Sequence, residues 1–337
     1  MRQKIPPILV TGGAGFIGSE FVRQTVAKGY RPIIVDKLTY AGDIKRLNDV
    51  KGKFTFYKSD ICNPKNLENI FKKAKPKFVF HFAAETHVDR SIQAADDFLK
   101  TNILGTQKLI DLSRKYKIKK FFHISTDEVY GESRQGQFSE QSPLKPNNPY
   151  SASKAGAEML VKAAIRTFNF PAIIISPANN YGPWQYPEKF VPVIILKALS
   201  GQKVPVYGKG EHIREWLHVA DCANGIFTIF KKGKLGEVYN IGSYYEKCNL
   251  VTAKTILKLL KKNASLIQFV KDRPGHDFRY SVNCTKLRRL GWRPQINYQT
   301  GIKQTVDWYV QHISWAKGKV RFLKSYWKKI YKTRGVS

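Results

Sequence analysis

Three glycines spaced three residues apart follow the first apolar run of the chain, and this spacing restricts the fold more than any other feature. The run is "PILV", and "TGGAGFIG" follows it with Gly12, Gly15 and Gly18. Between a strand and a helix, such glycines allow a tight turn and let a phosphate lie against backbone N–H groups at the helix N-terminus. We therefore expect the chain to begin with a strand–turn–helix unit that binds a nucleotide.

Strand-like and helix-like segments alternate through the N-terminal half, as in a parallel sheet with helices on both faces. Expected strands are 7–13, 31–36, 53–61, 78–84, 120–125 and 171–176, and expected helices are 15–29, 64–74, 95–116 and 150–168. Right-handed crossovers between such strands give a doubly wound α/β domain. The pattern predicts a Rossmann fold, a doubly wound parallel sheet, with a smaller C-terminal substrate-binding lobe.

Glycine and proline punctuate 181–210, after which 219–241 continues with a helix and a strand and 250–262 is helical. The domains that we predict are a nucleotide-binding domain at 1–178 with a returning segment near 215–246, an interleaved lobe at 179–312 and a basic extension at 313–337.

The composition indicates a globular, cytoplasmic protein. With 337 residues and 42% hydrophobic content, the chain can bury a large core. No apolar stretch approaches the roughly 18–20 residues that span a bilayer, and the strand expected from residue 7 leaves no room for a signal peptide. Cys62, Cys222, Cys248 and Cys284 show no metal or redox spacing, so we expect reduced thiols and no metal site.

The residues around the glycine turn favour NAD as its ligand. Asp36 ends the second expected strand, where a carboxylate can hold both hydroxyls of an adenosine ribose and would repel the 2′-phosphate of NADP. Asp60, in "KSDI", is expected beside the adenine. "HFAAET" puts small residues where another strand end meets the dinucleotide.

Tyr150 and Lys154, in "NPYSASKAGAE", lie four residues apart on an expected helix and therefore share one face. A lysine ammonium beside a phenol favours the phenolate, so we expect it to lower a phenol pKa that starts at about 10. Such a tyrosine can take a proton from a sugar hydroxyl while hydride leaves to NAD. A tyrosine and a lysine at this spacing are common by chance. The spacing is stronger evidence for such a site in a chain that also contains the glycine turn and, about 20 residues before Tyr150, the segment "STDE" at 125–128.

These segments resemble the extended short-chain dehydrogenase/reductases, and among them the dTDP-glucose 4,6-dehydratase family. The resemblance covers most of the chain and rests on "TGGAGFIG", "VDKLTYAG", "FAAETHVDRSI", "TNILGT", "STDEVYG", "PYSASK", "NNYGPWQYPEKFVP", "VYGKGEHIREWLHVAD", "EVYNIG" and "DRPGHDFRY". Several are shared with epimerases and decarboxylases, whereas "STDEVYG" with "NNYGPWQYPEK" is narrower. The resemblance implies a redox-neutral lyase that retains NAD. Such an enzyme oxidises dTDP-glucose at C4, removes water across C5–C6 and returns hydride to C6, giving dTDP-4-keto-6-deoxyglucose.

Elimination of water explains two adjacent carboxylates at the end of a strand. Once C4 is a ketone, a base must take the C5 proton and an acid must protonate the C6 hydroxyl. Two neighbouring carboxylates with different pKa values can do both. By resemblance, Asp127 is the acid and Glu128 the base, and Thr126 supplies a hydroxyl beside Tyr150 and Lys154.

The resemblance also implies the remaining contacts of the site. Cofactor contacts are expected from Gly12, Gly15, Phe16, Ile17, Gly18, Asp36, Lys37, Leu38, Thr39, Asp60, Ile61, Phe82, Ala83, Ala84, Thr101, Tyr150, Lys154 and Asn180. Substrate contacts are expected from Thr86, Thr126, Asn179, Glu188, Lys189, Phe190, Pro205, Val206, Tyr207, Arg214, Asn249, Arg273 and His276. Ser176, Pro177 and Ala178 stand where the family commonly has an arginine, a small residue and a serine, which leaves the cofactor pocket and the substrate preference open in detail.

Other functions remain alternatives at this point. Within the superfamily these are a 4,6-dehydratase for UDP-sugars and a nucleotide-sugar 4-epimerase. The formal net charge of +33 also suggests an alternative of another class, a nucleic-acid-binding protein on a Rossmann scaffold. Such a protein requires a basic face with interleaved aromatic residues. The basic residues are spread along the whole chain, and the catalytic motifs are complete, so we expect no obligate nucleic-acid partner.

Two further predictions concern assembly. The expected helix at 95–116 carries more apolar surface than one face needs, so we predict a homodimer in which it and the Tyr150 helix pair with their copies. The extension "SWAKGKVRFLKSYWKKIYKTRGVS" is basic, and on a helix its apolar residues share one stripe. It either docks on the protein's own body or makes a peripheral membrane contact. The stripe consists of Val320, Leu323, Trp327, Ile330 and Tyr331.

Overall fold

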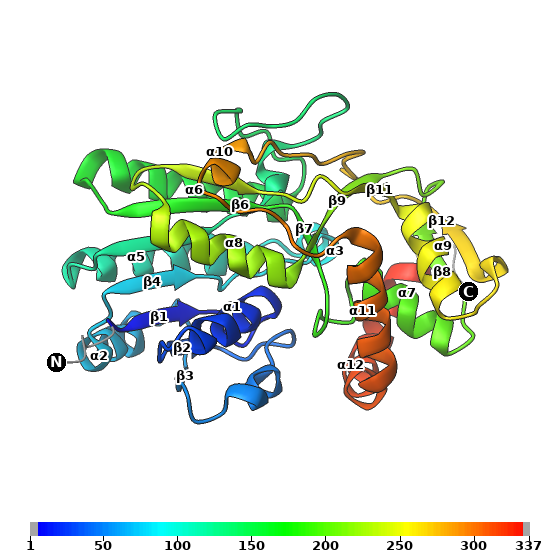
Figure 1. Cartoon of the computed structure of the whole chain (residues 1–337), viewed down its shortest axis with the longest axis horizontal. Coiled ribbons are helices and arrows are strands. Elements are labelled where there is room, and N and C mark those ends of the chain that lie inside the picture. The colour runs from blue at the N-terminus through cyan, green and yellow to red at the C-terminus, as the bar shows by residue number, and fades with distance from the viewer. Residues whose placement is uncertain (1–5, 333–337) are drawn as a thin grey trace.

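A parallel sheet of seven strands, in the order β10-β6-β5-β4-β1-β2-β3, forms the centre of the molecule (Figure 1). The computed structural model describes residues 6–332, with the backbone alone at Phe322 and after Leu323. The expected doubly wound α/β fold is confirmed. The strands are β1 (Ile8–Thr11), β2 (Ile33–Asp36), β3 (Thr55–Lys58), β4 (Phe78–His81), β5 (Lys120–Ile124), β6 (Ala172–Pro177) and β10 (Val238–Ile241).

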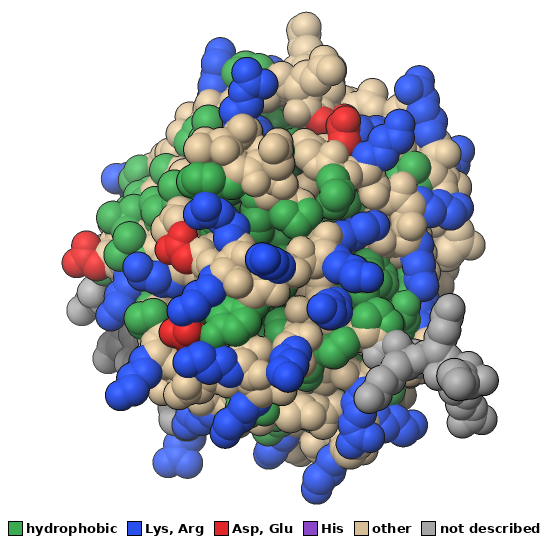
Figure 2. All heavy atoms as spheres, turned by 90° about the vertical axis from the view of Figure 1, so that its left-hand side faces the viewer, with side chains coloured by type: hydrophobic (Ala, Val, Ile, Leu, Met, Phe, Trp, Pro, Cys, Tyr) green, Lys and Arg blue, Asp and Glu red, His purple; other side chains and the backbone are tan. Residues whose placement is uncertain are grey.

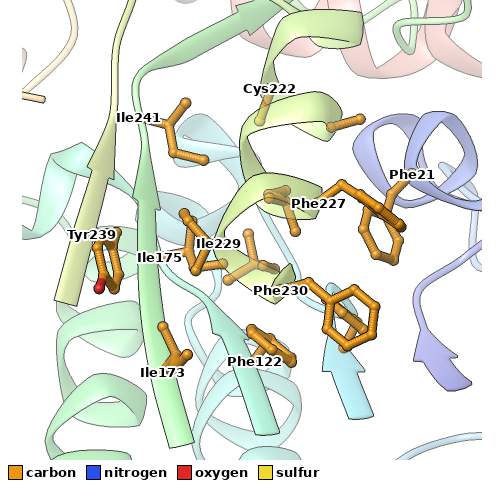
Figure 3. Close-up of a cluster of buried hydrophobic side chains, with 14 of the residues drawn as sticks. Phe21, Phe122, Ile173, Ile175, Cys222, Phe227, Ile229, Phe230, Tyr239 and Ile241 are labelled. Atoms are coloured by element: carbon orange, nitrogen blue, oxygen red, sulfur yellow. The ribbon is translucent and has the colours of Figure 1, made fainter. Parts of the chain in front are cut away.

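Helices cover both faces of this sheet, because its strands are apolar on both sides. Neighbouring residues of β5 point to opposite faces, so Phe122 packs under α1 and α8 while Phe121 packs under α2, α5 and α6. Figure 3 shows the first of these cores, where Phe227 and Phe230 of α8 meet Phe21 of α1. The helices are α1 (Phe16–Ala27), α8 (Val219–Lys232), α2 (Pro64–Ala74), α5 (Thr106–Lys115) and α6 (Pro149–Phe168).

The helix expected at 95–116 is interrupted. A π-helical segment, η2 (Leu99–Gly105), separates the short α4 (Asp96–Phe98) from α5. Within η2 the side-chain amide of Asn102 donates to the backbone oxygen of Glu85 at 3.0 Å and to Ser153 Oγ at 2.8 Å. These bonds tie the bulge to the loop after β4 and to α6, and such bulges often mark functional sites.

The second lobe has its own core and two small sheets. One sheet has the order β11-β9-β7 and the other pairs β12 with β8. Its strands are β7 (Asn179–Tyr181), β8 (Val204–Tyr207), β9 (Ile213–His218), β11 (Glu246–Cys248) and β12 (Ile267–Val270), and its helices are α7 (Phe190–Leu199), α9 (Asn249–Leu259), α11 (Tyr298–Gln311) and α12 (Ile313–Lys332). Shorter elements are η1 (Ile44–Val50), α3 (Val88–Gln93), η3 (Asp127–Tyr130), η4 (Ala264–Leu266) and α10 (Thr285–Arg289).

The first half of α12 packs on the protein's own body. Ala316 and Leu323 are buried, and Val320 lies against the same apolar clusters. Two members of the predicted apolar stripe are therefore engaged within the fold, which favours docking over membrane contact for this half. Trp327, Ile330 and Tyr331 lie outside the described side chains, so their part of the prediction stays open.

Two other expectations can be compared with the structure. All four cysteines are free thiols, as expected. Within residues 6–332, the structure contains no helix long and apolar enough to cross a membrane.

Candidate active site

The carboxyl ends of the sheet strands open into a cavity of about 440 Å³ that reaches from the glycine turn after β1 to the second lobe. The strand order reverses between β1 and β4, and open α/β sheets bind their ligands at such a switch point. Both lobes contribute to the wall. A ligand held at the sheet can therefore reach across to the second lobe.

The glycine turn approaches β4 too closely for any side chain. Gly12 has φ +70°, and a Cβ there would lie 2.5 Å from the backbone nitrogen of Ala83. A Cβ on Gly18 would lie 2.2 Å from the backbone oxygen of Gly12. The turn leads directly into α1, whose N-terminal N–H groups can receive a phosphate. The chain is thus built to carry a diphosphate at this point.

The carboxylate of Asp36 is fixed at the end of β2. Its two oxygens accept hydrogen bonds from the backbone N–H groups of Ala14, at 3.0 Å, and Leu38, at 2.8 Å. Burial raises the pKa of Asp36, and these two hydrogen bonds oppose that shift. Asp60, at the end of β3, pairs with Lys37 at 2.8 Å. The fixed carboxylate of Asp36 is therefore placed as an adenosine ribose requires, and Asp60 borders the same cavity.

Helix α6 presents Tyr150 and Lys154 to the cavity on one face. Asn148 caps the helix by accepting from the backbone N–H of Ser151 at 2.9 Å, and Pro149 occupies the first helical position. The cap fixes where the helix begins, and it thereby fixes the direction of the first turn that bears Tyr150. Both functional side chains are buried.

Burial shifts the pKa values of this pair toward their neutral forms. It lowers the pKa of Lys154 to about 8. It raises the pKa of Tyr150, and the Glu128 carboxylate adds to that effect while a hydrogen bond with Thr126 opposes it. The expected lowering of the phenol pKa is therefore wrong in direction. The ammonium of Lys154 donates to the backbone oxygen of Ile124 at 2.6 Å, and it does not offset the desolvation of the phenol.

Asp127 and Glu128 lie side by side in η3, in unlike environments. Thr126 caps this turn, with its Oγ1 accepting from the backbone N–H of Glu128 at 3.3 Å. Asp127 is buried, and burial raises its pKa well above the usual value, with Glu128 and Glu215 adding to the shift. Its Oδ2 has no hydrogen-bond partner among the described residues. Burial thus favours the protonated form of Asp127, and one of its oxygens is available to a ligand.

Glu128 is less buried than its neighbour and also faces the cavity. Its Oε2 lies 3.5 Å from the hydroxyl of Tyr280, which donates to Asp277 at 2.5 Å. The turn therefore offers a proton donor and a proton acceptor on adjacent residues, both within reach of one ligand.

A charged cluster closes the cavity on the side of α7. Glu188 accepts from the hydroxyl of Tyr40 at 3.0 Å and pairs with Arg90 at 3.2 Å. The next residue, Lys189, donates to the backbone oxygen of Thr86 at 2.8 Å. These contacts join the loops after β2 and β4 to the second lobe, so the ends of both loops are held over the cavity.

Arg214 on β9 is buried and lines the cavity. Its guanidinium donates to the backbone oxygens of Ile213 at 2.7 Å, Asp277 at 2.9 Å and Phe278 at 3.2 Å, and it lies 4.5 Å from the ring centre of Tyr280. The carbonyls hold the cation at the cavity wall, and none of the carboxylates whose side chains are described forms an ion pair with it, so its charge is available to an anionic ligand.

Asp272 joins two histidines at the same wall. His212 Nε2 lies 3.0 Å and His276 Nδ1 lies 2.6 Å from its carboxylate oxygens. The two rings are stacked, with centres 3.7 Å apart and planes inclined by 16°. A metal ion lies about 2.1 Å from a ligating ring nitrogen and close to the ring plane, and nearly parallel stacked rings cannot both meet that condition. The arrangement suits the orientation of His276 better than the binding of an ion.

Comparison with known proteins agrees with this geometry. The family model described as GDP-mannose 4,6 dehydratase matches residues 9–305. A dTDP-glucose 4,6-dehydratase of Neisseria meningitidis is 44% identical over 91% of this chain and 94% of its own length. One from Haemophilus influenzae is 46% identical over 90% and 97%. The crystal structure of DesIV, a dTDP-glucose 4,6-dehydratase from Streptomyces venezuelae with NAD and TYD bound, superposes with a TM-score of 0.90 at 41% identity and covers 93% of this chain and 99% of DesIV.

The chain belongs to the dTDP-glucose 4,6-dehydratase family. The resemblance inferred from the sequence motifs is thereby confirmed. The family model ends at residue 305, whereas the described helix α12 begins at Ile313, so this helix lies beyond the matched region.

The cavity of this family member brings the predicted residues together with two exceptions. Leu38 and Val206 are not among the residues that line it. Val206 points into the core of the second lobe, because it alternates along β8 with Pro205 and Tyr207, which do line the cavity. Leu38 contributes its backbone N–H to Asp36. The predicted residues that line the cavity are Gly12, Gly15, Phe16, Ile17, Gly18, Asp36, Lys37, Thr39, Asp60, Ile61, Phe82, Ala83, Ala84, Thr86, Thr101, Thr126, Asp127, Glu128, Tyr150, Lys154, Asn179, Asn180, Glu188, Lys189, Phe190, Pro205, Tyr207, Arg214, Asn249, Arg273 and His276.

Several lining residues of the dehydratase cavity were not predicted, among them Arg46, Glu85, Gln185 and Tyr280. Tyr280 ends the quoted segment "DFRY", so its place in that motif could have indicated it. Arg46 gives no such signal, since it belongs to a 3-10 helix without a motif. Burial of an arginine in a polar network is the kind of feature that only the fold reveals.

The departure from the family pattern lies in the cavity wall. Pro177 and Ala178 line the cavity, whereas Ser176 is buried in β6 opposite Asn240 of β10. The wall is therefore apolar at these two positions.

Proposed function

We propose that the protein converts dTDP-glucose into dTDP-4-keto-6-deoxyglucose as an NAD-dependent lyase. One observation carries this proposal: the buried, proton-holding carboxyl of Asp127 stands beside the carboxylate side chain of Glu128, in one cavity with Tyr150 and Lys154. Membership of the dTDP-glucose 4,6-dehydratase family supports the same reaction. A 4-epimerase moves hydride at one carbon only and has no need of an acid–base pair for elimination.

The cofactor side of the cavity fits NAD. The glycine turn and the start of α1 can receive the pyrophosphate, and the fixed carboxylate of Asp36 can accept from both ribose hydroxyls. Bound NAD supplies a hydride acceptor for C4 and later a hydride donor for C6.

Tyr150 is the residue that we assign to the C4 hydroxyl. Its phenol is connected to Thr126 by a hydrogen bond, and Thr126 Oγ1 lies 3.3 Å from Asp127 Oδ1. In its phenolate form, which the positive charges of Lys154 and of bound NAD⁺ would favour, Tyr150 would take the proton of the C4 hydroxyl as C4 becomes a ketone. Lys154, one turn along the same helix, supplies a positive charge that stabilises the phenolate form.

Elimination follows at C5 and C6. Glu128 takes the C5 proton, and Asp127 gives its proton to the C6 hydroxyl, which leaves as water. After C6 has received hydride, Glu128 returns its proton to C5. The proton that Tyr150 gained then restores Asp127 through Thr126, so that the protein ends each cycle as it began.

The reaction is tested by incubating the protein with dTDP-glucose and measuring the mass of the product. We expect a product lighter by one water, with the alkali-induced absorbance of a 4-keto sugar. A product of unchanged mass would indicate epimerisation and would overturn the proposal. UDP-glucose, run in parallel, decides the base preference, because a faster reaction with UDP-glucose would favour the alternative dehydratase.

We also propose a homodimer. Leu99 and Leu104 on η2 and Met159 on α6 have 47%, 57% and 55% of their surface exposed, and these two elements pack against each other. These three exposed side chains give the packed pair η2 and α6 apolar surface that a second copy can cover. Light scattering should give the mass of a dimer, and Leu104→Glu with Met159→Glu should give a monomer. A monomeric wild-type protein at micromolar concentration would contradict the proposal.

A further inference from the structure

Helix α12, which lies beyond the family match, contacts the loop that borders the cofactor side of the cavity. This cofactor loop, residues 37–43, follows β2 and contains three of the predicted cofactor contacts. At its end, Asp43 Oδ2 accepts from Trp315 Nε1 at 2.9 Å and pairs with Lys319 Nζ at 2.8 Å. Two side chains of α12 therefore hold the end of the loop.

Asp43 also contacts the glycine turn. It is buried, its backbone N–H donates to the oxygen of Ala14 at 3.0 Å, and its Oδ1 accepts from the backbone N–H of Lys45 at 3.0 Å. Lys319 and Trp315 lower the pKa of Asp43 against the effect of its burial, so the group is a carboxylate at neutral pH. One carboxylate thus joins α12, the cofactor loop and the turn that receives the pyrophosphate.

Apolar contacts reinforce the same junction. Leu323 is 1% exposed and packs in a cluster with Tyr40 and Ala41 of the cofactor loop and with Tyr186 and Val193. The loop is therefore covered by α12 over a distance of two helical turns.

A buried arginine lies beneath this cover. Arg46 is 1% exposed, and its Nη1 donates to the backbone oxygens of Ala14, at 2.9 Å, and Ala41, at 2.7 Å. Its Nε donates to Trp184 at 3.1 Å, and the ring of Trp315 lies 5.7 Å from its Cζ. Opening the loop would break these bonds and would expose the apolar cluster to water.

We propose that α12 is a strap that keeps the cofactor loop closed, with Trp315 and Lys319 as positioning residues that slow the release of NAD. This inference rests on the proposed function. An enzyme that regenerates its cofactor within each cycle does not need to exchange it. A cofactor loop that α12 keeps closed therefore does not slow turnover. Neither side chain is placed among the residues that act on the substrate.

The test compares NAD release from wild type, Trp315→Phe/Lys319→Met and the control Lys317→Met, which changes an exposed lysine of the same helix. Each protein is loaded with radiolabelled NAD, and loss of label is followed against excess unlabelled NAD. The double variant loses the hydrogen bond and the ion pair to the charged group of Asp43, so we expect release of NAD at least tenfold faster than from wild type. The control should match wild type.

Several outcomes would overturn the strap. Equal release rates for the double variant and wild type are one, and equally fast release from Lys317→Met is another. If the double variant does not fold, Lys319→Met alone carries the test, because it removes only the ion pair. Turnover with saturating NAD should stay at the wild-type value. Failure of wild type to bind NAD or to form product would refute the proposed function, and this result is distinct from failure of the strap alone.

A separate observation concerns the end of the sheet opposite the cavity. In a parallel sheet every helix-to-strand connection lies at the amino edge, and Figure 2 shows Lys and Arg side chains spread over this side of the molecule with few acids between them. Sixteen of the 34 residues in six connections are Lys or Arg and one is acidic, against 58 basic residues in the whole chain of 337. We call this the basic face; its segments are 28–32, 51–54, 72–77, 114–119, 166–171 and 231–237.

Helix ends account for only part of this charge. Basic residues in the last turn of a helix interact favourably with its dipole, as at Lys72 and Lys115. Both of these pair with Glu68, yet their side chains are 60% and 61% exposed. Nine of the sixteen lie outside the helices, and three of these nine, Lys28, Lys51 and Lys75, are C-cap residues at a helix end. The nine are Lys28, Arg31, Lys51, Lys53, Lys75, Lys77, Lys117, Lys119 and Lys234.

The composition of the basic face suits a lipid surface better than nucleic acid. Thirteen of its sixteen basic residues are lysines, whereas recognition of nucleic acid favours arginine and stacked aromatic rings. Phe168 and Leu235 are each 50% exposed on this face. Their loops are adjacent, since the backbone N–H of Gly236 donates to Ala172 at 2.8 Å. Exposed apolar side chains among lysines are typical of peripheral membrane contacts.

We infer that the basic face binds anionic phospholipid, with Phe168 and Leu235 entering the interface. Seven strands spaced about 4.8 Å apart make this edge about 30 Å wide, which suits a planar surface. The cavity opens at the other edge of the sheet, so the substrate retains access. Lysines near such a surface are attracted to its anionic headgroups.

The test is co-sedimentation with phosphatidylcholine vesicles and with vesicles that also contain phosphatidylserine. The variant Lys75→Glu/Lys77→Glu/Lys117→Glu/Lys119→Glu is compared with Lys254→Glu/Lys258→Glu/Lys261→Glu/Lys262→Glu, which makes the same charge change with exposed lysines of the second lobe. Wild type should bind only the anionic vesicles. The first variant should bind them at least tenfold more weakly, the second should keep most of the binding, and both should keep turnover.

Two results would overturn the inference. Equal losses in the two variants would show that net charge, and not this face, governs binding. Binding of wild type to duplex RNA or DNA at physiological salt without binding to anionic vesicles would assign the face to nucleic acid.

Discussion

Replacement of Asp127 by asparagine should slow the reaction strongly and should also stabilise the protein as pH rises. Asparagine has the same shape and can still bond to Thr126, but it has no proton of comparable acidity to give to the C6 hydroxyl. The cavity, Tyr150 and Lys154 are left as they are. The variant therefore isolates the proton that burial keeps on Asp127.

The two effects have opposite signs and separate magnitudes. Loss of a general acid slows the step about 10²–10⁴-fold, or ~3–5 kcal/mol of barrier. The pKa of Asp127 is raised in the folded state, so folding takes up a proton at pH values between the unfolded-state and folded-state pKa. The contribution of this group to stability is therefore complete at pH below about 3.9, and it is lost as pH rises through the folded-state pKa. Each pKa unit of that rise costs about 1.4 kcal/mol at high pH. The cost is absent in Asp127→Asn.

Two measurements test these statements. Product formation from dTDP-glucose should fall by the stated factor, while the absorbance of reduced nicotinamide appears on mixing, because oxidation at C4 does not need Asp127. Thermal unfolding between pH 4 and pH 8 should show Asp127→Asn gaining on wild type as pH rises, by ~2 °C for each kcal/mol. Asp111→Asn, an exposed acid on α5, serves as the control with no such gain. Near wild-type turnover in Asp127→Asn, or a stability difference that does not grow with pH, would refute the role given to Asp127.

Three other substitutions have definite expected outcomes. Gly18→Ala places a Cβ 2.2 Å from the oxygen of Gly12 and should abolish NAD binding by equilibrium dialysis, whereas Gly318→Ala, with open space around it on α12, should leave NAD binding unchanged. Lys154→Met should remove turnover. Because burial lowers the pKa of Lys154 to about 8 in the folded protein, wild type should gain stability relative to this variant as pH rises from 8 to about 10.4, measured by thermal unfolding. Phe122→Ala empties a fully buried position and should cost about 3–5 kcal/mol in denaturant unfolding.

Much of the sheet was predictable because parallel strands leave a strong trace in a sequence. Strands buried on both faces are continuous apolar runs, such as "PAIIIS" for β6, and the glycines after β1 mark the turn. The break in the helix expected at 95–116 left no such trace. It depends on bonds from Asn102 to Glu85 and Ser153, which only the folded chain brings together.

The site was predictable where it consists of motifs, and not where it consists of packing. Tyr150, Lys154 and the "STDE" segment carry their signal in local spacing and in resemblance. The contact between Trp315 and Asp43 joins residues 272 positions apart, and Arg46 finds its partners in three different loops. Neither arrangement has a local pattern that could be recognised in advance.

The pKa values were the least predictable property of the site. A four-residue spacing fixes which helix face two side chains share, but it does not fix how deeply that face is buried from water. Burial is the first cause of the pKa shift at Tyr150, Lys154 and Asp127, and in all three it favours the neutral form. Lys154, with a pKa of about 8, still carries its charge at neutral pH, while Asp127 and Tyr150 hold their protons. Before the cofactor binds, the site therefore contains an acid ready at C6 and a phenol that cannot act as a base at C4 until the positive charge near it increases. Bound NAD⁺ brings such a charge, so proton removal at C4 should depend on an oxidised cofactor being in place.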